Sequence, residues 1–454
     1  MKRTTLRTIA AALAVLGLVA ASCGDDDDTT EPSATTAPGG GNETSAPDDD
    51  DALSAIGIDL DDCGGSYDPV EGVSDTEILV GQSVPKSGPA ATFALLTAGM
   101  NGYFAYANAE LDGVNGRQIR LIDLDDAYEP ARTAQNVDEL LNEGVFVTAG
   151  ILGTPQNLAV RDTLNEECVP HLFPSTGAPE WGDAENYPWT VGGAVIPYNV
   201  EARAWAEYLT ETFPNGAKVV ALQMDNEFGE SYEDWLRHYL EDTNIELTTI
   251  EKHDPTAPDI RNQMTTLAAT DADVAIAMTT SGYCTQFMKS FEGSDWQPTR
   301  LVSGTCKTGI LFQGAGGGAT GSLILAASKE ITDGSYDADP EASKIREGLA
   351  KYAPGAPANV SLVAIGWLYG ELLRDVLLRA DDLDGGLTRP NVLLAARATD
   401  YPPSLLYDGI RLHMDGLDDT YLLEAGRIEK WNGTTFEKVT DIYDYEGDTQ
   451  PTFD

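Results

Sequence analysis

The stretch ILVGQSVPKSGPAATF, residues 78–93, contains the features that predict the fold of the chain. It begins with a largely apolar run at 78–84, which is typical of a strand buried on both faces of a parallel sheet. Proline, glycine and serine, which favour turns, follow this run, and a helix is then predicted from about 90 to 111. The stretch therefore predicts a strand–loop–helix unit of an α/β protein.

The same order of elements recurs along the chain in two series. The first series continues with predicted strands at 118–126, 145–150 and 169–173, and with a helix that begins at Pro130 and ends near Gly144. The second series has a helix at 200–213, a helix that ends near Leu240, and strands at 218–224, 273–278 and 300–305. Because strands that alternate with helices build parallel sheets covered on both faces, we expect two α/β lobes in tandem.

Six loops follow predicted strands, at the edge where parallel α/β sheets bind ligands. They lie at 83–93, 150–157, 174–177, 225–230, 279–283 and 303–307. Glycine, hydroxyl and aromatic residues are common in them, and histidine and paired carboxylates are rare. Any single loop of this composition can serve only as a turn, but six at equivalent positions favour a site that holds a small molecule.

The N-terminus carries the signals of an exported chain. Three basic residues precede the apolar run IAAALAVLGLVAA at 9–21, which predicts a signal peptide over residues 1–22. The small residues before Cys23 resemble the bacterial lipobox, so we expect a lipidated Cys23 that anchors an extracytoplasmic protein to the cell membrane. A plain secretory signal with a coincidental cysteine is the alternative.

Residues 23–76 are predicted to form a disordered acidic tether. From Gly24 to about Asp62 the chain is rich in Asp, Thr, Pro, Gly and Ser and contains no Lys or Arg. This composition supplies too little apolar surface to fold, and its negative charges repel one another. The formal net charge of the whole chain is −46, which argues against nucleic acid as a partner because clustered Lys and Arg bind phosphates.

Four cysteines follow Cys23, and an even number in an oxidising compartment predicts disulfides. Three pairings are open. Because Cys284 and Cys306 lie near the ends of successive predicted strands, we favour the pairs Cys63–Cys168 and Cys284–Cys306. The chain has no CxxC spacing and its four histidines are scattered, so we expect no metal site and no cofactor.

Two short motifs resemble those of penicillin-recognising serine enzymes. SVPK at 83–86 has the spacing of S-x-x-K, and KTG at 307–309 matches a further motif of that class. In those enzymes the serine starts a helix, but here Pro85 intervenes and the middle motif is missing. GAGGG at 314–318 lacks the lysine of a phosphate loop. We therefore expect a protein that is not an enzyme.

Several segments together resemble the substrate-binding proteins of branched-chain amino-acid ABC transporters, the leucine/isoleucine/valine-binding relatives of the type I periplasmic binding-protein class. These segments are ILVGQSVPKSGPAATF, IRLIDLDDAYEPARTAQNVDELL, VPHLFPSTGAPEWGD and LQMDNEFGESY. The similarity extends from about Glu77 to Gly433. It implies two Rossmann-like lobes, three hinge crossings and a ligand cleft between the lobes.

The resemblance also implies the extent of each lobe. Lobe one comprises 77–197 and 331–415, and lobe two comprises 198–330 and 416–445. A closing hairpin with its turn near Asn432 and Gly433 belongs to lobe two. The C-terminal tail at 446–454 is either a strap or loose.

The ligand contacts implied by the resemblance come from both lobes. Phe93 matches an aromatic residue of the first loop, and Phe228 matches one that closes over the ligand from lobe two. Thr154 and the Pro-Ser-Thr-Gly loop match segments that hold an amino-acid head group. The full set is Phe93, Thr154, Ser175, Thr176, Gly177, Phe228, Thr280, Ser281, Tyr283 and Thr305.

The chain departs from leucine-binding relatives in the loop SGTCKTG at 303–309. In those relatives a glutamate of this loop meets the ligand's ammonium group, because a buried unpaired charge is costly. The loop supplies no acid here, so Asp225 or Glu227 is the alternative acid, and Lys307 favours a second carboxylate on the ligand.

We therefore expect a monomeric solute-binding receptor that delivers its ligand to an ABC permease. The expected ligand is a branched-chain or other amino acid, or a small carboxylate or amide. Binding should favour closure, because only the closed arrangement lets both lobes touch the ligand. A sensor of the same fold that signals to a partner is one alternative, and a serine hydrolase that uses Ser83 and Lys86 is the other.

Overall fold

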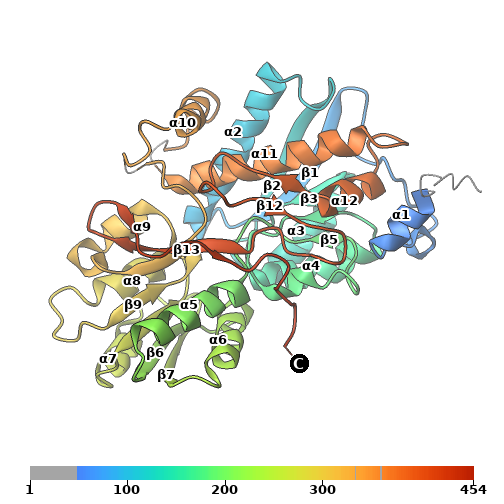
Figure 1. The fold of residues 1–454 in the computed structure, drawn as a ribbon. Helices are drawn as coiled ribbons and strands as arrows, with labels where there is room; N and C mark the ends of the chain where they lie inside the picture. The colour runs from blue at the N-terminus through green and yellow to red at the C-terminus, as the bar shows by residue number, and fades with distance from the viewer. Residues whose placement is uncertain (1–48, 333, 358–359, 454) are drawn as a thin grey trace, which may run out of the picture. The chain divides into compact units, whose positions relative to one another are not determined.

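The computed structural model describes residues 49–332, 334–357 and 360–453, so the predicted signal peptide and Cys23 lie outside the described residues. Within these ranges the chain forms two α/β lobes, each built around one main sheet (Figure 1). No helix in this part of the chain is long and apolar enough to cross a membrane.

Lobe one is built on a parallel five-stranded sheet in the order β2-β1-β3-β4-β5. Its strands are β1 (Glu77–Val84), β2 (Gln118–Asp125), β3 (Val147–Ala149), β4 (His171–Leu172) and β5 (Thr190–Val191). Its helices are α2 (Ala94–Glu110), α3 (Pro130–Asn142), α4 (Thr154–Glu166), α10 (Pro340–Tyr352), α11 (Ser361–Asp381) and α12 (Arg389–Arg397). A small two-stranded sheet pairs β11 (Asp400–Tyr401) with β12 (Leu412–His413).

The two faces of β1 carry different helices because successive side chains point to opposite sides of a sheet. On one face, Gln82 accepts a hydrogen bond of 2.7 Å from Thr97 of α2, and α2 lies beside α11 (Figure 1). On the other face, Asn136 of α3 donates to Ser83 at 3.0 Å. The strand that decides the fold is therefore covered by helices on both sides, as its apolar character predicts.

Lobe two has a larger, mixed sheet in the order β14-β13-β10-β9-β8-β6-β7, with β15 paired to β13. Its strands are β6 (Ala217–Met224), β7 (Ile245–His253), β8 (Val274–Met278), β9 (Thr299–Val302), β10 (Leu323–Ala326), β13 (Ala425–Trp431), β14 (Phe436–Lys438) and β15 (Tyr443–Asp444). Its helices are α5 (Tyr198–Thr212), α6 (Glu227–Leu240), α7 (Arg261–Ala268), α8 (Gly282–Lys289) and α9 (Gly309–Gly314). The predicted closing hairpin is confirmed as β13–β14, with Gly433 at a φ of 106° in its turn.

Each lobe has its own large apolar core, and the described chain passes between the two lobes three times. The crossings lie at 191–198, 325–326 and 425–428, between the elements of one lobe and those of the other. Ala178 and Trp181, in the segment between β4 and β5, pack with the lobe-two core although the chain does not cross there. Two of the three crossings lead into strands of lobe two or out of them, so the hinge is continuous with that sheet. The three crossings inferred from the resemblance are confirmed.

Residues 49–76 are folded, so the predicted boundary of the disordered tether at residue 76 is wrong. They include helix α1 (Asp49–Ala55), and Leu53, Ile56 and Ile58 are buried in the core of lobe one. Cys63 is bonded to Cys168, which lies 105 residues further along the chain. The acidic composition of this segment did not indicate that it folds, because a few well-spaced apolar residues among many acids decide its packing.

The C-terminal residues 446–453 form a strap. The backbone N–H groups of Gly447 and Thr449 donate to the Glu424 carboxylate at 2.8 and 3.1 Å. At its end, Phe453 packs against the aromatic residues of α6. Of the two alternatives for the tail, the structure therefore has the strap.

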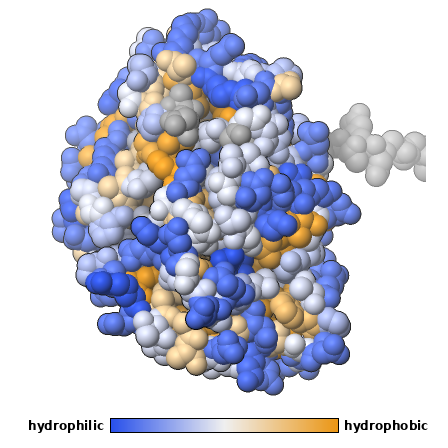
Figure 2. Space-filling model, turned by 90° about the vertical axis from the view of Figure 1, so that its left-hand side faces the viewer, coloured by the Kyte–Doolittle hydropathy of each residue, from blue (hydrophilic) through white to orange (hydrophobic). Residues whose placement is uncertain are grey.

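The surface agrees with the acidic composition of the chain. Hydrophilic residues cover most of the face in Figure 2, with smaller hydrophobic areas between them. The sequence holds 74 acidic and 28 basic residues, and this excess of one charge favours solubility.

Candidate functional site

A cavity with about 1020 Å³ of empty space, part of it open to solvent, is lined by residues of both lobes. All six loops that follow predicted strands reach its wall, as expected for the carboxyl edges of two parallel sheets. They contribute Phe93, Leu152, Gly153, Ser175, Phe228, Thr280, Gly304, Thr305 and Lys307. Helix α11 and the hinge add mainly apolar side chains, among them Leu325, Leu362, Ile365 and Leu368.

The structure brings half of the predicted ligand contacts to this cavity. Phe93, Ser175, Phe228, Thr280 and Thr305 line it. The other predicted contacts, Thr154, Thr176, Gly177, Ser281 and Tyr283, are not among the described residues that line it. Contact with a ligand stays a prediction for all ten residues.

The hydroxyl groups predicted to hold a head group bind one another behind the cavity wall. Thr154 Oγ1 and Thr176 Oγ1 are 2.6 Å apart, and Thr176 Oγ1 lies 3.1 Å from the hydroxyl of Tyr198. The carbonyl of Gly177 accepts the backbone N–H of Tyr198 at 2.6 Å. These bonds join lobe one to the first turn of α5, so this cluster fixes the hinge side of the cavity.

Ser281 and Tyr283 also make contacts within the protein. Ser281 Oγ donates to the carbonyl of Pro89 at 3.0 Å, which links a lobe-two loop to the first loop of lobe one. The hydroxyl of Tyr283 donates to the carbonyls of Pro255 and Ala257 at 2.8 and 2.7 Å. Ser281 therefore bridges the two lobes, and Tyr283 fixes the loop after β7.

Thr280 offers the cavity an unused hydroxyl group. Its side chain is buried, and Oγ1 has no hydrogen-bond partner among the described residues. Buried polar atoms without partners are rare because they lose their bonds to water. This hydroxyl group is therefore available for a hydrogen bond in the cavity.

Glu201, in the first turn of α5, lines the cavity and is only 1% exposed. Its Oε1 accepts the backbone N–H of Gly304 at 2.7 Å, and its Oε2 accepts the hydroxyl of Tyr232 at 2.5 Å. Burial raises the pKa of the Glu201 carboxyl to about 8. At neutral pH this acid is therefore mostly protonated.

The sequence analysis missed Glu201. It sought an acid in the loops and named Asp225 or Glu227, but both are exposed and neither belongs to the described wall of the cavity. A signal was present, since Glu201, Trp205 and Leu209 follow the i, i+4, i+8 spacing of one helix face. An acid at the end of an apolar stripe indicates a buried carboxyl group.

Lys307, expected to favour a second carboxylate, is already paired. Its ammonium group lies 2.9 Å from Glu429 Oε2, and 3.3 Å from both the carbonyl of Ser328 and the hydroxyl of Tyr407. Three acceptors match the three hydrogens of the group. Lys307 is therefore part of the hinge.

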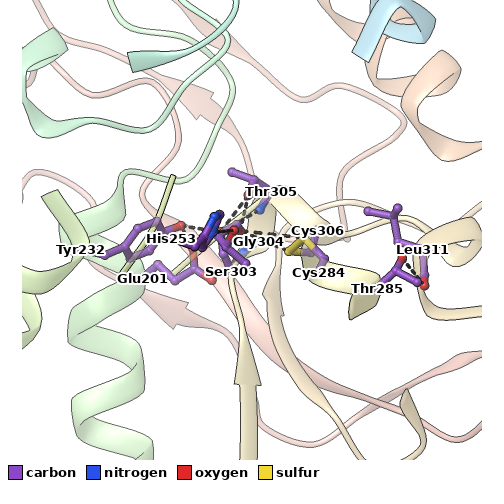
Figure 3. Close-up of a disulfide and its surroundings, with 11 residues drawn as sticks. Glu201, Tyr232, His253, Cys284, Thr285, Ser303, Gly304, Thr305, Cys306 and Leu311 are labelled. Carbon is purple, nitrogen blue, oxygen red and sulfur yellow. Dashed lines mark hydrogen bonds between the residues drawn. A yellow bond between two sulfur atoms is a disulfide. The ribbon is translucent and has the colours of Figure 1, made fainter. Parts of the chain in front are cut away.

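A disulfide holds the lobe-two wall from behind (Figure 3). Cys284 of α8 is bonded to Cys306, next to Thr305 in the loop that carries Gly304. Figure 3 shows Ser303 and Gly304 between this bond and the side chains of Glu201 and Tyr232. Both disulfides are the pairs that the sequence analysis favoured.

Ser83 and Lys86 do not form a catalytic pair. Ser83 is fully buried and its hydroxyl donates to Asp126 at 2.7 Å. Lys86 instead forms an ion pair with Asp123. The hydrolase alternative therefore fails on geometry.

Among the described residues, one group has the composition of a metal site. His413, Asp419 and Glu446 offer ligand atoms that lie within 4.8 Å of one another. The side chains of His413 and Glu446 are 40% and 38% exposed, so water can solvate them in place of a metal. None of the three lines the cavity.

Two lobes, three crossings and a cavity lined from both sides define a hinged two-lobe binding protein. The chain belongs to the periplasmic binding protein family, whose model matches residues 77–416. This family consists of extracytoplasmic binding proteins and not of enzymes, so the expectation of a non-enzymatic protein is confirmed.

A curated relative is the Leu/Ile/Val-binding protein homolog 2 of Brucella abortus strain 2308. It is 25% identical over 181 residues, which are 40% of this chain and 48% of the relative. The chain thus matches about half the length of the curated relatives.

Solved structures share the fold over most of the chain. A branched-chain amino acid ABC transporter protein of Thermus thermophilus with bound valine has a TM-score of 0.73 at 18% identity, covering 82% of this chain and 97% of its own. A solute-binding protein of R. palustris in complex with benzoate has a TM-score of 0.67 at 16% identity, covering 80% and 95%. A fatty acid ABC transporter substrate-binding protein of Thermomonospora curvata has a TM-score of 0.68 at 19% identity, covering 82% and 94%. These likenesses establish the fold.

Proposed function

We propose that the protein is the solute receptor of an ABC importer and captures a small organic solute with an apolar body between its lobes. The observation that carries this proposal is the cavity, which draws on all six loops and on both lobes. Its wall is mainly apolar, with a few polar groups such as Ser175, Thr280 and Glu201. Ligand sites of this kind use apolar surface for affinity and a few polar groups for orientation.

The structural relatives support a role in an ABC importer and a small organic ligand. Proteins of this fold bind valine and benzoate, and a further one serves fatty acid transport. These ligands share an apolar body and a carboxylate. We propose an amino acid, carboxylate or amide of similar size for this chain, and an ABC permease as its partner.

The test is thermal unfolding of the folded part in the presence of a library of amino acids, amines, small carboxylates and alcohols. A ligand at 100 times its dissociation constant adds about 2.7 kcal/mol to the free energy of unfolding, which is a readable shift of the midpoint. Absence of any shift across the library would overturn the proposal.

Two matched variants test whether the shift of the unfolding midpoint comes from binding in the cavity. Thr305→Trp places a large side chain in the cavity wall. It should abolish the shift of the midpoint, because the indole ring occupies space that the ligand needs. Ile310→Trp adds the same side chain in the same lobe at a position that is 48% exposed, and should keep the shift. Equal shifts in both variants would show that the ligand binds elsewhere.

We also propose that Cys23 carries the lipid anchor. The support is the signal-peptide pattern and the small residues that precede this cysteine. Labelled palmitate should be incorporated into the wild-type chain and not into Cys23→Ser. Incorporation in both would show that Cys23 is not the lipidated residue.

A further inference from the structure

Glu201 belongs to the lobe-two part of the cavity wall and is only 1% exposed. Its two oxygens each accept one hydrogen bond within the protein, from the backbone of Gly304 and from the hydroxyl of Tyr232. A carboxylate can accept about four hydrogen bonds, so the two oxygens of Glu201 keep acceptor capacity for a donor group of a ligand. The loop that carries Gly304 can approach Glu201 closely because residue 304 has no side chain. A Cβ at this position would lie only 3.3 Å from Glu201 Oε2.

No cation of the protein neutralises this carboxyl group within the described ranges. Lys307 is the cationic residue in the described wall of the cavity, and its three hydrogens already meet Glu429, Ser328 and Tyr407. A buried carboxylate without a positive partner is costly, which agrees with the raised pKa of Glu201. The carboxyl group of Glu201 therefore has no cationic partner within the described ranges, and a ligand can supply one.

The surroundings of Glu201 suit a cation with an organic body. Tyr198, Phe228 and Tyr232 line the same wall, and the rings of Tyr198 and Phe228 meet edge to face at 5.1 Å. Aromatic rings attract a desolvated cation more strongly than other apolar side chains do. The unpaired hydroxyl of Thr280 supplies a further acceptor in this wall.

We propose that Glu201 is the specificity-determining residue that accepts a positively charged nitrogen of the ligand, and that the ligand is an organic amine with an apolar body. This inference rests on the proposed function and selects, among the small organic solutes with an apolar body, the amines and amino acids that carry a cationic nitrogen. When the ammonium group binds, the carboxyl group of Glu201 releases its proton to water, so one carboxylate meets one ammonium. The loop at 303–309 then needs no acid of its own.

The other groups that face Glu201 do not take up or release this proton. From α6, the pKa of Tyr232 is raised well above its ordinary value by burial, and burial raises that of Tyr198 in α5 to about 12. Burial lowers the pKa of His253, at the end of β7. Its Nε2 lies 2.8 Å from Oγ1 of Thr279 in the loop after β8. Lys307 is held in its ion pair with Glu429.

The test uses amines in matched pairs with compounds that lack the nitrogen. 3-Methylbutylamine is paired with 3-methyl-1-butanol, phenethylamine with 2-phenylethanol, and L-leucine with 4-methylpentanoate. We expect at least one amine to bind about tenfold or more tightly than its partner. In Glu201→Gln its affinity should fall about 10- to 100-fold, since a hydrogen bond to a charged group contributes about 1.5–3 kcal/mol.

Glu330→Gln is the matched control. Glu330 is also buried, and its Oε2 accepts the backbone N–H of Gly309 at 3.1 Å, but it is not part of the described cavity wall. Its variant should bind the amine as the wild type does. An equal loss in both variants would indicate a structural effect and overturn the inference.

Proton release tests the wild-type protein directly. Calorimetry at pH 7 in two buffers with different ionisation enthalpies should show release of up to one proton for each amine bound, and affinity should rise between pH 6 and 8. No release would overturn the inference even where Glu201→Gln fails to fold. Binding confined to the nitrogen-free compounds would overturn it and leave the proposed function standing, whereas no binding by any compound would overturn both.

Discussion

Glu201 and Glu424 are two buried acids with similar chemistry and different neighbours. Both accept backbone N–H groups, and burial raises the pKa of Glu201 to about 8 and that of Glu424 to about 7. The C-terminal strap supplies two donors to Glu424, so the chain itself completes that site. Glu201 accepts from one backbone donor and one hydroxyl, and it belongs to the wall of the cavity. A buried acid thus stabilises the fold where the chain itself covers it, as at Glu424. Where the acid lies beside a cavity, as at Glu201, it can bind a ligand.

Removing the disulfide behind Glu201 should have the largest effect on this comparison. The double variant Cys284→Ser, Cys306→Ser frees a loop closed over 22 residues, for which loop entropy predicts a loss of about 3 kcal/mol in the free energy of unfolding. Urea unfolding measures this loss. Hydrogen exchange at Gly447 should stay unchanged, because the strap does not depend on this bond; faster exchange there would contradict the separation of the two sites.

Truncating the two acids compares them directly. Glu201→Ala leaves the hydroxyl of Tyr232 and the N–H of Gly304 without their acceptor inside the protein, which should cost about 2–3 kcal/mol. Glu424→Ala frees two N–H groups of the exposed strap, which water can reach, and should cost about 1 kcal/mol. Chemical unfolding of both variants decides the order, and equal losses would show that the strap buries Glu424 as fully as the lobes bury Glu201.

The dependence of stability on pH separates the two acids further. Each folded-state pKa lies above the unfolded value of 4.5, so the folded form holds a proton that the unfolded chain has lost, and stability falls as pH rises. This fall should end near pH 7 for Glu424 and continue to about pH 8 for Glu201. Glu201→Gln should therefore gain stability relative to the wild type between pH 7 and 8. A constant difference over that range would contradict the assignment.

Loosening the end of the strap should have the smallest effect. Phe453 is 45% exposed, and its ring lies 4.8 Å from the rings of Trp235 and His238. Phe453→Ala should therefore cost only about 0.5–1 kcal/mol, the usual contribution of an aromatic pair. It should speed hydrogen exchange at Thr449 and leave exchange at Gly304 unchanged. Faster exchange at both would show that the strap also supports the cavity wall.

Sequence patterns predicted the parts of the fold with strong local signals. The strands β1, β6 and β8 are largely apolar runs, and β2 mixes apolar with polar residues. Helix α3 is marked by Pro130 at its start and Gly144 after its end. Helices α10, α11 and α12 and strand β7 were not predicted individually. The first half of helix α11, residues 361–370, is buried at nearly every position, so it lacks the periodicity of a surface helix.

The site was predictable as a set of loops but not as a set of contacts. Strand order places all six loops at the cavity, which sequence can anticipate. Whether a hydroxyl faces the cavity depends on backbone and side-chain angles that no short sequence pattern specifies. Thr154 and Thr280 both follow predicted strands, yet only Thr154 has a hydrogen-bond partner for its hydroxyl among the described residues. Glu201 reaches the loop at Gly304 from 103 residues away, a contact that no local pattern contains.

The attachment of residues 49–63 to lobe one has a mechanical consequence. Helix α1 packs into that lobe, and the bond from Cys63 to Cys168 locks the entering chain to it. A molecule immobilised at helix α1 therefore keeps lobe one at rest, and rotation about the three crossings displaces lobe two. The lever arm of such a rotation grows with distance from the hinge. A fluorophore on α7 should then report the movement with greater amplitude than one on α2.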